Sequence, residues 1–260
     1  MKIATCLAEV PARETRYELN TDGSWIKETD LSYEINECDE YALEEALVLR
    51  GKHSGEVAIM TVGRERSEKS MRKGLAMGAD RGILVLDEET RLTSPHAVAT
   101  AMAEVLKQET FDLILAGTQS DHYSYAETGV ILAELLGLPH ATIVMEIEAS
   151  PEEKRVKALR EMESGAFQWV ELPLPAVLTI QAGISKVRFA SLKGIMQAKK
   201  KEIRKVRLGE LEIDLGSIPQ LEIRRLYFPE PTARAEMLQG DAESVAEQLI
   251  EKLRKEERVI

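Results

Sequence analysis

The polar segment GTQSDHYSYAET, residues 117–128, contains the side chains that are the best candidates in this chain for a chemical role, by residue type and spacing. Asp121 and His122 are adjacent in it and could form an acid–base pair. Neighbouring residues do not normally orient each other for proton transfer, so catalysis by this pair is the weaker interpretation. Cys38 could be a reactive thiol near a helix start, and an unreactive loop cysteine is the simpler interpretation. These residues favour binding over catalysis.

The rest of the sequence contains no catalytic or metal-binding motif. The motifs GxSxG and HExxH and the phosphate-binding P-loop are all missing, and the isolated glycines are typical of turns. None of the four histidines has metal-ligand spacing to a cysteine or an acidic residue: His53, His96, His122 and His140. We therefore expect neither an enzyme nor a metal protein.

The segment 117–128 connects a buried strand to a helix. FDLILAG, residues 111–117, is a nearly continuous apolar run, typical of a strand buried on both faces of a parallel sheet. VILAELLG has helical spacing from Val130 and ends at Gly137, with Pro139 just beyond. The connection exceeds the usual length of about two to six residues. Ligands bind where such loops leave the strands, and the helix start suits a phosphate; an ordinary connection is the alternative.

The first half of the chain alternates strands and helices. Four apolar runs are predicted as strands, and a helical pattern follows each: residues 2–7, 57–62, 82–86 and 111–117. Asn36 or Asp39 is expected to cap the first helix, and Gly51 to end it. Ser94 and Pro95 mark the start of a later helix. This order predicts a Rossmann-like, doubly wound parallel α/β sheet with right-handed crossovers.

After Pro139 the sequence no longer alternates predicted strands with predicted helices. Four further strands with only turns between them predict an antiparallel addition at the sheet edge: residues 142–147, 155–162, 167–171 and 176–180. The lysines from Lys199 to Lys201 lie in a basic segment and form a solvated face or pair with an acidic partner. The segment from Leu208 onward ends in a helix that begins after Asp241, and it has too few apolar residues to bury a core of its own. We therefore expect a nucleotide-binding type of α/β domain at residues 1–185 and an extended C-terminal arm at residues 186–260.

Composition limits the partners and the compartment. The chain has 260 residues and a formal net charge of −11, which argues against nucleic acid or an anionic membrane surface as partner. No apolar run approaches the roughly 18 to 20 residues of a membrane span, and the start MKIATCL is interrupted too soon for a signal peptide. The two cysteines, Cys6 and Cys38, do not make a disulfide framework. We expect a soluble protein of the cytoplasm or another reducing compartment.

Several segments resemble, in order and spacing along nearly the whole chain, the beta subunit of electron transfer flavoproteins. They are YALEEALVLR after Asn36, GLAMGADRGILV, ALREMESGAFQWVELPLPAVLTI and SLKGIMQAKKKEI. The resemblance implies an adenine-nucleotide-binding fold that pairs with a larger alpha subunit holding most of the redox FAD. It also implies a structural AMP in the beta subunit. Such a heterodimer carries electrons from flavin dehydrogenases to a quinone reductase, so this chain would be an electron carrier without chemistry of its own.

The resemblance also assigns site residues. The nucleotide site would combine two strand ends, the segment before the first helix and the long polar loop: Cys6, Asn36, Glu37, Cys38, Asp39, Val62, Gly117, Thr118, Gln119, Ser120, Asp121, His122, Tyr123, Ser124, Tyr125, Ala126, Glu127 and Thr128. The phosphate would lie on donors at residues 124–128. Glu161 matches a residue that reaches toward the mobile FAD domain of alpha. Leu192, flanked by Ile195 and Met196, matches a leucine that enters a pocket on the dehydrogenase; the alternative is a core leucine.

Three segments depart from the family's usual pattern. Asn36 is followed by Glu37 where relatives have proline, and the loop begins TQSDHY where they have a basic residue, QAID and further acids. Ser185 to Phe189 replace the family's NEPRY. The fold and the pairing with alpha tolerate these changes, whereas the identity of the nucleotide depends on them. Two alternatives therefore stay open: an electron-bifurcating, NADH-dependent subunit with a second FAD in place of AMP, and a stand-alone nucleotide-binding regulator that forms a homodimer.

Overall fold

The computed structural model of the chain divides into two compact units. The residues that the structure describes are 1–89, 92–230, 235–256 and 258–259. The first unit comprises Met1–Glu18 and Lys27–Ile223, and the second comprises Leu19–Ile26 and Arg224–Ile260. This division differs from the predicted boundary at residue 185, because the chain from there to Ile223 belongs to the first unit.

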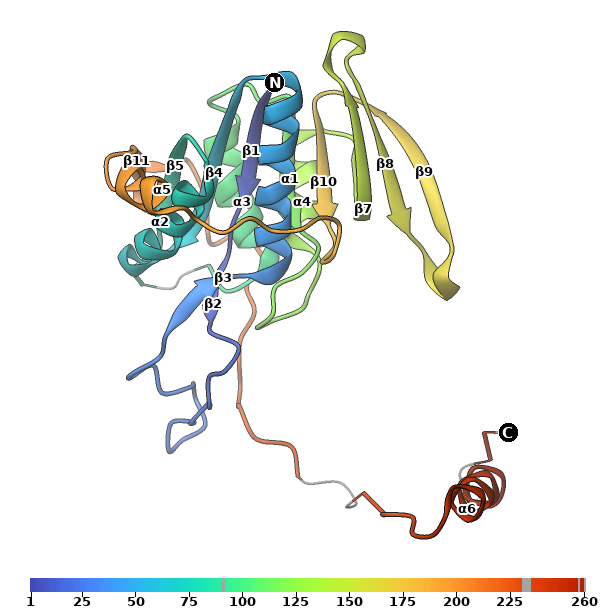
Figure 1. Ribbon diagram of the computed structural model, residues 1–260. Helices are drawn as coiled ribbons and strands as arrows, with labels where there is room; N and C mark the ends of the chain where they lie inside the picture. Colours follow the sequence, from blue (N-terminus) through green and yellow to red (C-terminus); the bar gives the residue numbers. More distant parts are fainter. Residues whose placement is uncertain (90–91, 231–234, 257, 260) are drawn as a thin grey trace. The chain divides into compact units, whose positions relative to one another are not determined.

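A mostly parallel sheet forms the centre of the first unit (Figure 1). Within the described part of the chain it has nine strands, in the spatial order β11 (Ile203–Arg207), β5 (Arg81–Leu86), β4 (Glu56–Gly63), β1 (Lys2–Cys6), β6 (Leu113–Gly117), β10 (Ala176–Ile180), β7 (His140–Ser150), β8 (Arg155–Glu161) and β9 (Phe167–Pro173). Neighbours from β11 to β7 pair in parallel, and β8 and β9 continue antiparallel from β7. The predicted Rossmann-like sheet with an antiparallel addition is confirmed.

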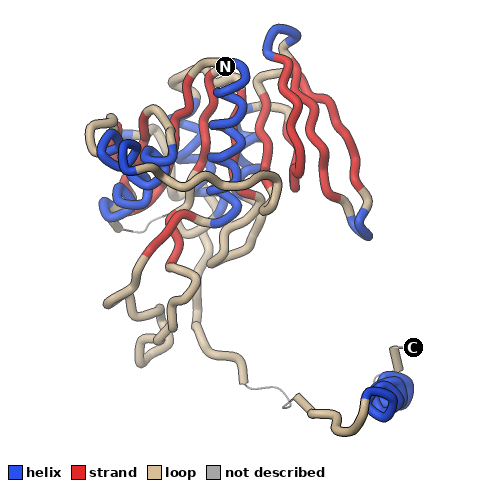
Figure 2. The backbone as a smooth tube through the Cα atoms, viewed as in Figure 1, coloured by secondary structure: helices blue, strands red, loops and turns tan. Residues whose placement is uncertain are grey.

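Helices cover both faces of this sheet (Figures 1 and 2). One face carries α1 (Glu37–His53), α2 (Glu68–Met77) and α5 (Leu192–Ala198), and the other carries α3 (Pro95–Leu106) and α4 (Thr128–Leu136). Successive strand residues point to opposite faces, so Ile3 of β1 joins the core under α1 while Ala4 joins the core under α3. Burial on both faces explains why the parallel strands are almost continuously apolar.

Short elements complete the described structure. β2 (Glu9–Pro11) and β3 (Tyr33–Ile35) form a separate antiparallel pair. The 3-10 turns are η1 (Glu65–Ser67), η2 (Pro151–Glu153), η3 (Glu163–Gly165) and η4 (Leu208–Glu210). In the second unit, Leu19 bridges Ile26, and the backbone N–H of Leu226 donates to Gly23 O at 2.8 Å. That unit ends in α6 (Ala242–Lys255), whose first turn is capped as predicted, since Asp241 accepts from Ser244 N at 2.9 Å.

The helix boundaries of the first unit follow the sequence signals with one exception. Ser94 Oγ accepts from Ala97 N at 3.1 Å and so caps α3, as predicted. Gly137 ends α4 in the left-handed conformation, with φ 64°. The end of α1 predicted at Gly51 is wrong, because the helix continues to His53. Arg50, directly before Gly51, donates to Gly78 O at 2.9 Å, and the helix penalty of one glycine is only about 1 kcal/mol.

The strand at residues 176–180 is not part of the antiparallel addition, so that prediction is wrong. β10 lies inside the sheet between β6 and β7 and pairs with both in parallel. All five of its residues are buried, as expected for a central parallel strand. The antiparallel addition therefore consists of β8 and β9, which continue from β7 and form one edge of the sheet.

The other edge of the sheet comes from the basic segment, which the sequence did not predict as a strand. β11 reads IRKVR and pairs in parallel with β5, from Ile203 opposite Gly82 to Arg207 opposite Leu86. Lys201 just before it is not simply solvated, because its Nζ donates to Leu75 O at 3.0 Å. This pairing is the physical reason why the first unit extends past residue 185.

Candidate functional site

The carboxyl ends of β1 and β6 lie side by side where the connections of the sheet diverge. β1 leads through α1 to β4 on one side, and β6 leads through α4 to β7 beyond its other side. Open α/β sheets bind ligands outside such a switch point. The loop 118–127 and the first turn of α1 both begin at this edge, so their side chains form the candidate site.

Asp39 joins the two strand ends. It is buried in the first turn of α1. Its Oδ2 accepts from Ala8 N at 2.8 Å, just after β1, and its Oδ1 accepts from Gly117 N at 2.7 Å, at the end of β6. A Cβ on Gly117 would stand 2.4 Å from Asp39 Oδ1, so this close approach requires glycine. Asp39 therefore builds the floor of the site, and its carboxylate oxygens are already used.

Asn36 fixes the polar loop above that floor. Its Nδ2 donates to Gln119 O at 2.8 Å, and its Oδ1 accepts from Asp121 N at 2.9 Å. The carboxylate of Asp121 accepts from Glu37 N at 3.4 Å. The predicted capping of α1 by Asn36 or Asp39 is wrong, because burial turns both side chains toward backbone partners 31 to 85 residues away.

Burial dominates the titration of the groups at this edge. It raises the pKa of Asp39 to about 7, although the hydrogen bonds from Ala8 and Gly117 act in the opposite direction. It also raises the pKa of Cys6 to about 12, with a smaller contribution from Asp39. The pKa of Cys38 is raised as well, mainly by burial. Cys38 lies inside α1 and not in the predicted loop, and both thiols stay protonated near neutral pH.

The polar loop has an aromatic surface. The rings of Tyr123 and Tyr125 stack with their centroids 5.5 Å apart, and the ring of His122 lies 4.2 Å from that of Tyr123. His122 thus contacts tyrosine, while the carboxylate of Asp121 bonds to the start of α1. The principal contacts of these two side chains are therefore with different partners, Tyr123 for His122 and Glu37 for Asp121.

The backbone of the same loop is unusual near α4. Ser124 and Ala126 have positive φ angles of 54° and 56°, a conformation that non-glycine residues rarely adopt. The Ser124 backbone N–H and Oγ both donate to Ser120 O, at 2.9 and 3.1 Å. Backbone strain of this kind is concentrated at ligand sites. The two strained residues lie shortly before the first turn of α4.

The start of α4 leaves donors available for an anion. The side chain of Glu127 precedes the helix without capping its backbone N–H groups. Thr118 Oγ1, at the start of the same loop, is buried and has no hydrogen-bond partner among the described residues. Free helix amides with a positive dipole end suit a phosphate, and an unpartnered buried hydroxyl suits a ligand oxygen. The residues present therefore fit an anionic group such as a phosphate.

Most of the residues predicted for the nucleotide site lie together at the switch point, whereas Val62 packs against the core. The edge of the switch point brings together Cys6, Asn36, Glu37, Cys38, Asp39 and the loop from Gly117 to Thr128. Val62 lies within β4 and packs against the core under α3. Glu37 forms an ion pair with Arg13 at 3.4 Å. Sequence reasoning missed Ala8, because a backbone donor leaves no signal in the side chain.

The residues predicted for partner docking lie on β8 and α5, outside the cluster of residues at the switch point. Glu161 ends β8 in the antiparallel addition. Leu192, Ile195 and Met196 occupy one face of α5, where Leu192 is 83% and Met196 71% exposed. The alternative of a core leucine is therefore wrong. Sequence reasoning missed Phe189, which is 95% exposed; an aromatic residue inside a basic segment was its only signal.

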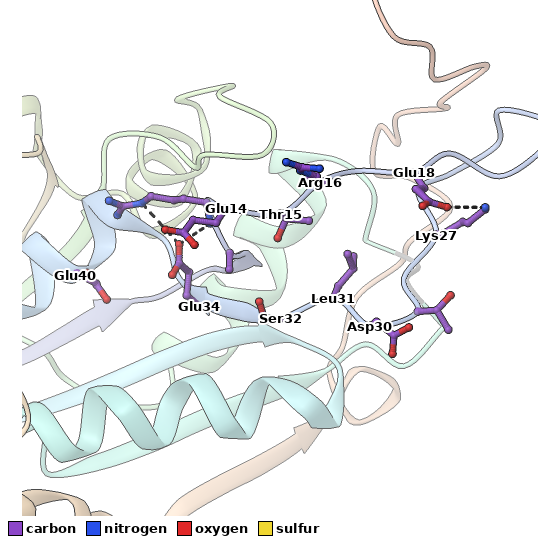
Figure 3. A pocket seen from close by; sticks show the side chains of 13 residues that line it. Glu14, Thr15, Arg16, Glu18, Lys27, Asp30, Leu31, Ser32, Glu34 and Glu40 are labelled. Carbon is purple, nitrogen blue, oxygen red and sulfur yellow. Dashed lines mark hydrogen bonds and ion pairs between the residues drawn. The ribbon is translucent and has the colours of Figure 1, made fainter.

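A separate cavity of about 1110 Å³ opens under the connection between β2 and β3 (Figure 3). Charged side chains line it, and several of them pair with each other. Arg13 lies 3.7 Å from Glu34, and Lys27 lies 2.8 Å from Glu18. Because its charges compensate one another in this way, the switch point with its free helix amides is the better ligand site.

A doubly wound, mostly parallel sheet with helices on both faces places the chain in the class of Rossmann-like α/β proteins. Comparison with known proteins narrows this class. Residues 24–211 match the electron transfer flavoprotein domain. The chain belongs to the electron transfer flavoprotein family.

Named relatives cover nearly all of the chain. The electron transfer flavoprotein subunit beta of Methylophilus methylotrophus is 37% identical over 257 residues, which are 96% of this chain and 97% of the relative. The subunit beta of Bradyrhizobium diazoefficiens is 35% identical over 261 residues, covering 100% of both chains. The subunit beta of Bacillus subtilis is 31% identical over 249 residues, 95% of this chain and 96% of the relative. The similarity thus extends beyond residue 211 into the arm.

Across the described ranges, no helix has the length and apolar character needed to cross a membrane. In the same residues, no group of three or more histidine, cysteine, aspartate or glutamate side chains is arranged to hold a metal ion.

Proposed function

We propose that this chain is the beta subunit of a heterodimeric electron transfer flavoprotein and works as an electron carrier in a reducing, cytoplasmic compartment. The heterodimer would take electrons from flavin dehydrogenases and deliver them to a quinone reductase or a similar acceptor. The observation that carries this proposal is the polar loop, which Asn36 ties to α1 over the switch point. The family resemblance assigns a nucleotide to the same loop.

A structural AMP is the nucleotide that we propose for this subunit. The backbone N–H groups at the start of α4 would bind its phosphate, and Thr118 Oγ1 would gain the hydrogen-bond partner that it lacks in the protein alone. The adenine would lie against the strand ends. Because Asp39 already accepts from Ala8 and Gly117, it would hold the two strand ends together without touching the phosphate.

The redox FAD would be held mainly by the alpha subunit and would supply the electron transfer when bound. The residues of this chain would position it and dock its partners. Glu161, at the end of β8, would face the FAD domain of alpha. Cys6 and Cys38 stay protonated, and both carboxylate oxygens of Asp39 already accept backbone hydrogen bonds. A carrier role needs none of these groups as an acid, base or nucleophile.

The surface of α5 would dock the dehydrogenase. Leu192 and Met196 are exposed apolar side chains, and the basic residues Lys193, Lys199 and Lys200 surround them on the same short segment. An apolar anchor in a basic rim suits an apolar pocket with an acidic rim, and long-range attraction speeds a brief encounter. Electron carriers require such brief complexes.

The nucleotide content of the heterodimer tests the proposal directly. The complex is purified with its alpha subunit and denatured, and the released nucleotides are separated and quantified. One FAD and one AMP per heterodimer would support the proposal of an electron carrier with a structural AMP. Two FAD and no AMP would replace it with an electron-bifurcating subunit, for which NADH is the expected reductant. Failure to find a partner or a nucleotide, together with a stable homodimer, would replace it with a stand-alone regulator.

A pair of threonine variants localises the nucleotide. Thr118→Val removes the unpartnered hydroxyl at the proposed site and should lower AMP content without changing FAD content. Thr5→Val is the matched control, because Thr5 Oγ1 is also buried without a partner but lies within β1. Equal AMP retention in both variants would contradict the placement of the nucleotide at Thr118.

A further inference from the structure

The segment between β10 and α5 passes over α1 (Figure 1), and a charge pair between Arg188 and Glu44 joins the two, while Ile184 and Ala190 on either side pack against the core. Arg188 Nε and Nη2 donate to Oε2 and Oε1 of Glu44, each at 2.7 Å, and the Arg188 backbone N–H donates to Oε2 at 3.1 Å. Glu44 is buried in α1. A bidentate arginine–carboxylate pair of this kind fixes orientation as well as distance. The chain at residue 188 is therefore locked onto α1.

The far end of α5 is held by a second arginine. Arg72 of α2 donates through Nη1 to Ala198 O at 2.7 Å and to Lys201 O at 2.6 Å. Between the two arginines, α5 lies directly against the end of α2, where a Cβ on Gly194 would stand 2.3 Å from Ala76 O. The docking helix is thus attached to the body at both of its ends.

This attachment presents apolar side chains to the solvent. Phe189 follows Arg188 directly, and Leu192 lies one residue beyond the cap of α5, where Ser191 Oγ accepts from Gly194 N at 3.0 Å. A free segment would turn such side chains onto the apolar surface of the protein. Exposed apolar groups on a fixed support are typical of an interaction site.

We propose that Arg188 and Glu44 are a positioning pair that holds Phe189 and Leu192 in the geometry required for docking on a flavin dehydrogenase. This inference rests on the docking role proposed above for α5. The pair does not touch the partner. It lowers the ordering cost of binding, since a segment that is already fixed loses little conformational freedom in the complex. It should therefore set the affinity of docking and leave electron transfer within the complex unchanged.

The expected effect is a loss of affinity of about tenfold. Ordering one backbone residue on binding costs enough to weaken a complex by roughly this factor. Release of Arg188 frees the adjoining Phe189, whereas Ala190 still packs against the core and Ser191 still caps α5. The concentration of protein needed for half-maximal reduction should rise accordingly, at an unchanged limiting rate.

The test variant removes both charges. Arg188→Met alone would leave Glu44 buried and unpaired, and the protein would be destabilised for that reason only. Glu44→Leu combined with Arg188→Met avoids the unpaired charge while it removes all three hydrogen bonds. Glu171→Leu with Arg155→Met is the matched control, because this exposed pair at 3.4 Å joins β8 and β9.

The measurement uses the full heterodimer with its alpha subunit. The probe is a flavin dehydrogenase from the same organism that reduces the wild-type heterodimer. The half-saturating concentration and the limiting rate are determined for each variant, together with hydrogen exchange of residues 184–192. We expect a half-saturating concentration about tenfold higher and faster exchange in the test variant only, with normal flavin content.

Leu192→Ala separates failure of this inference from failure of the docking role. If Leu192→Ala weakens reduction while the Glu44/Arg188 variant behaves like wild type, docking on α5 stands and the positioning role is wrong. If the limiting rate falls instead of the affinity, the positioning role is also wrong. If Leu192→Ala itself leaves the half-saturating concentration unchanged, the docking role is wrong and this inference falls with it.

Discussion

Replacement of Asp39 by asparagine should change how the stability of this protein depends on pH. The Asp39 carboxylate is buried, which favours its neutral form, yet it accepts two backbone hydrogen bonds at 2.7 and 2.8 Å, which favour its charged form. Burial prevails, since the pKa rises from its ordinary 3.8 to about 7. Asp39→Asn removes the titration while it keeps the shape of the side chain.

The sign of the effect follows from proton binding. Between about pH 4 and pH 7 the folded protein keeps a proton on Asp39 that the unfolded chain has released. The stabilisation from this group is complete below its ordinary pKa and is lost as the pH rises through about 7. One pKa unit corresponds to about 1.4 kcal/mol, so the loss between pH 5 and pH 8 amounts to about 2 to 3 kcal/mol. The asparagine variant lacks this loss.

The assay is urea unfolding of wild type and Asp39→Asn, followed by circular dichroism at several pH values from about 5 to about 8. The free energy of unfolding of wild type relative to the variant should fall by about 2 to 3 kcal/mol across this range. Asp112→Asn is the control, because the exposed Asp112 accepts from Lys2 N at 2.6 Å at the opposite end of β1. A relative stability of wild type that rises with pH would refute the reasoning, since hydrogen bonding would then outweigh burial.

Three further variants test the site, the docking surface and the fold. Gly117→Ala should reduce nucleotide content and destabilise the protein by about 1 to 3 kcal/mol, because its Cβ would meet Asp39 Oδ1 at 2.4 Å; retention of nucleotide in a folded variant would contradict this placement. Leu192→Ala should slow reduction by a dehydrogenase by at least fivefold at low concentration, with unchanged flavin content and melting temperature. Ser94→Ala should lower unfolding stability by about 1 to 2 kcal/mol through loss of the α3 cap, and an unchanged melting temperature would argue against that cap.

Features with a local physical cause could be predicted from the sequence. The run from Leu113 to Gly117 is apolar because both faces of its strand are buried, and this requirement is visible in the residues themselves. Gly137 ends α4 because it adopts a left-handed conformation that other residues disfavour. The length of the loop between them identified the switch point for the same reason, since a simple connection does not need ten residues between β6 and α4.

Features that depend on distant partners could not be predicted. β10 follows three strands joined by turns, so local order favoured an antiparallel position, yet the chain returns to the centre of the sheet. Asn36 and Asp39 are common capping residues in a common capping position, and only the folded chain brings Ala8 and Gly117 within reach of Asp39. The residue types of Asn36 and Asp39 predicted helix capping, whereas in the structure both side chains bind backbone groups that are distant in the sequence.

α1 connects the two proposed functional surfaces of the first unit. Asn36, directly before its first turn, holds the polar loop, and Glu44 holds the docking segment through Arg188. At 1.5 Å per residue, Asp39 and Glu44 stand about 7.5 Å apart along the helix axis and point in different directions. No side chain is shared between the two sets of contacts, so the coupling between the surfaces runs through the position of the helix as a whole. A structural nucleotide suits this arrangement, because it would complete the contacts at the end of the helix that supports the docking surface.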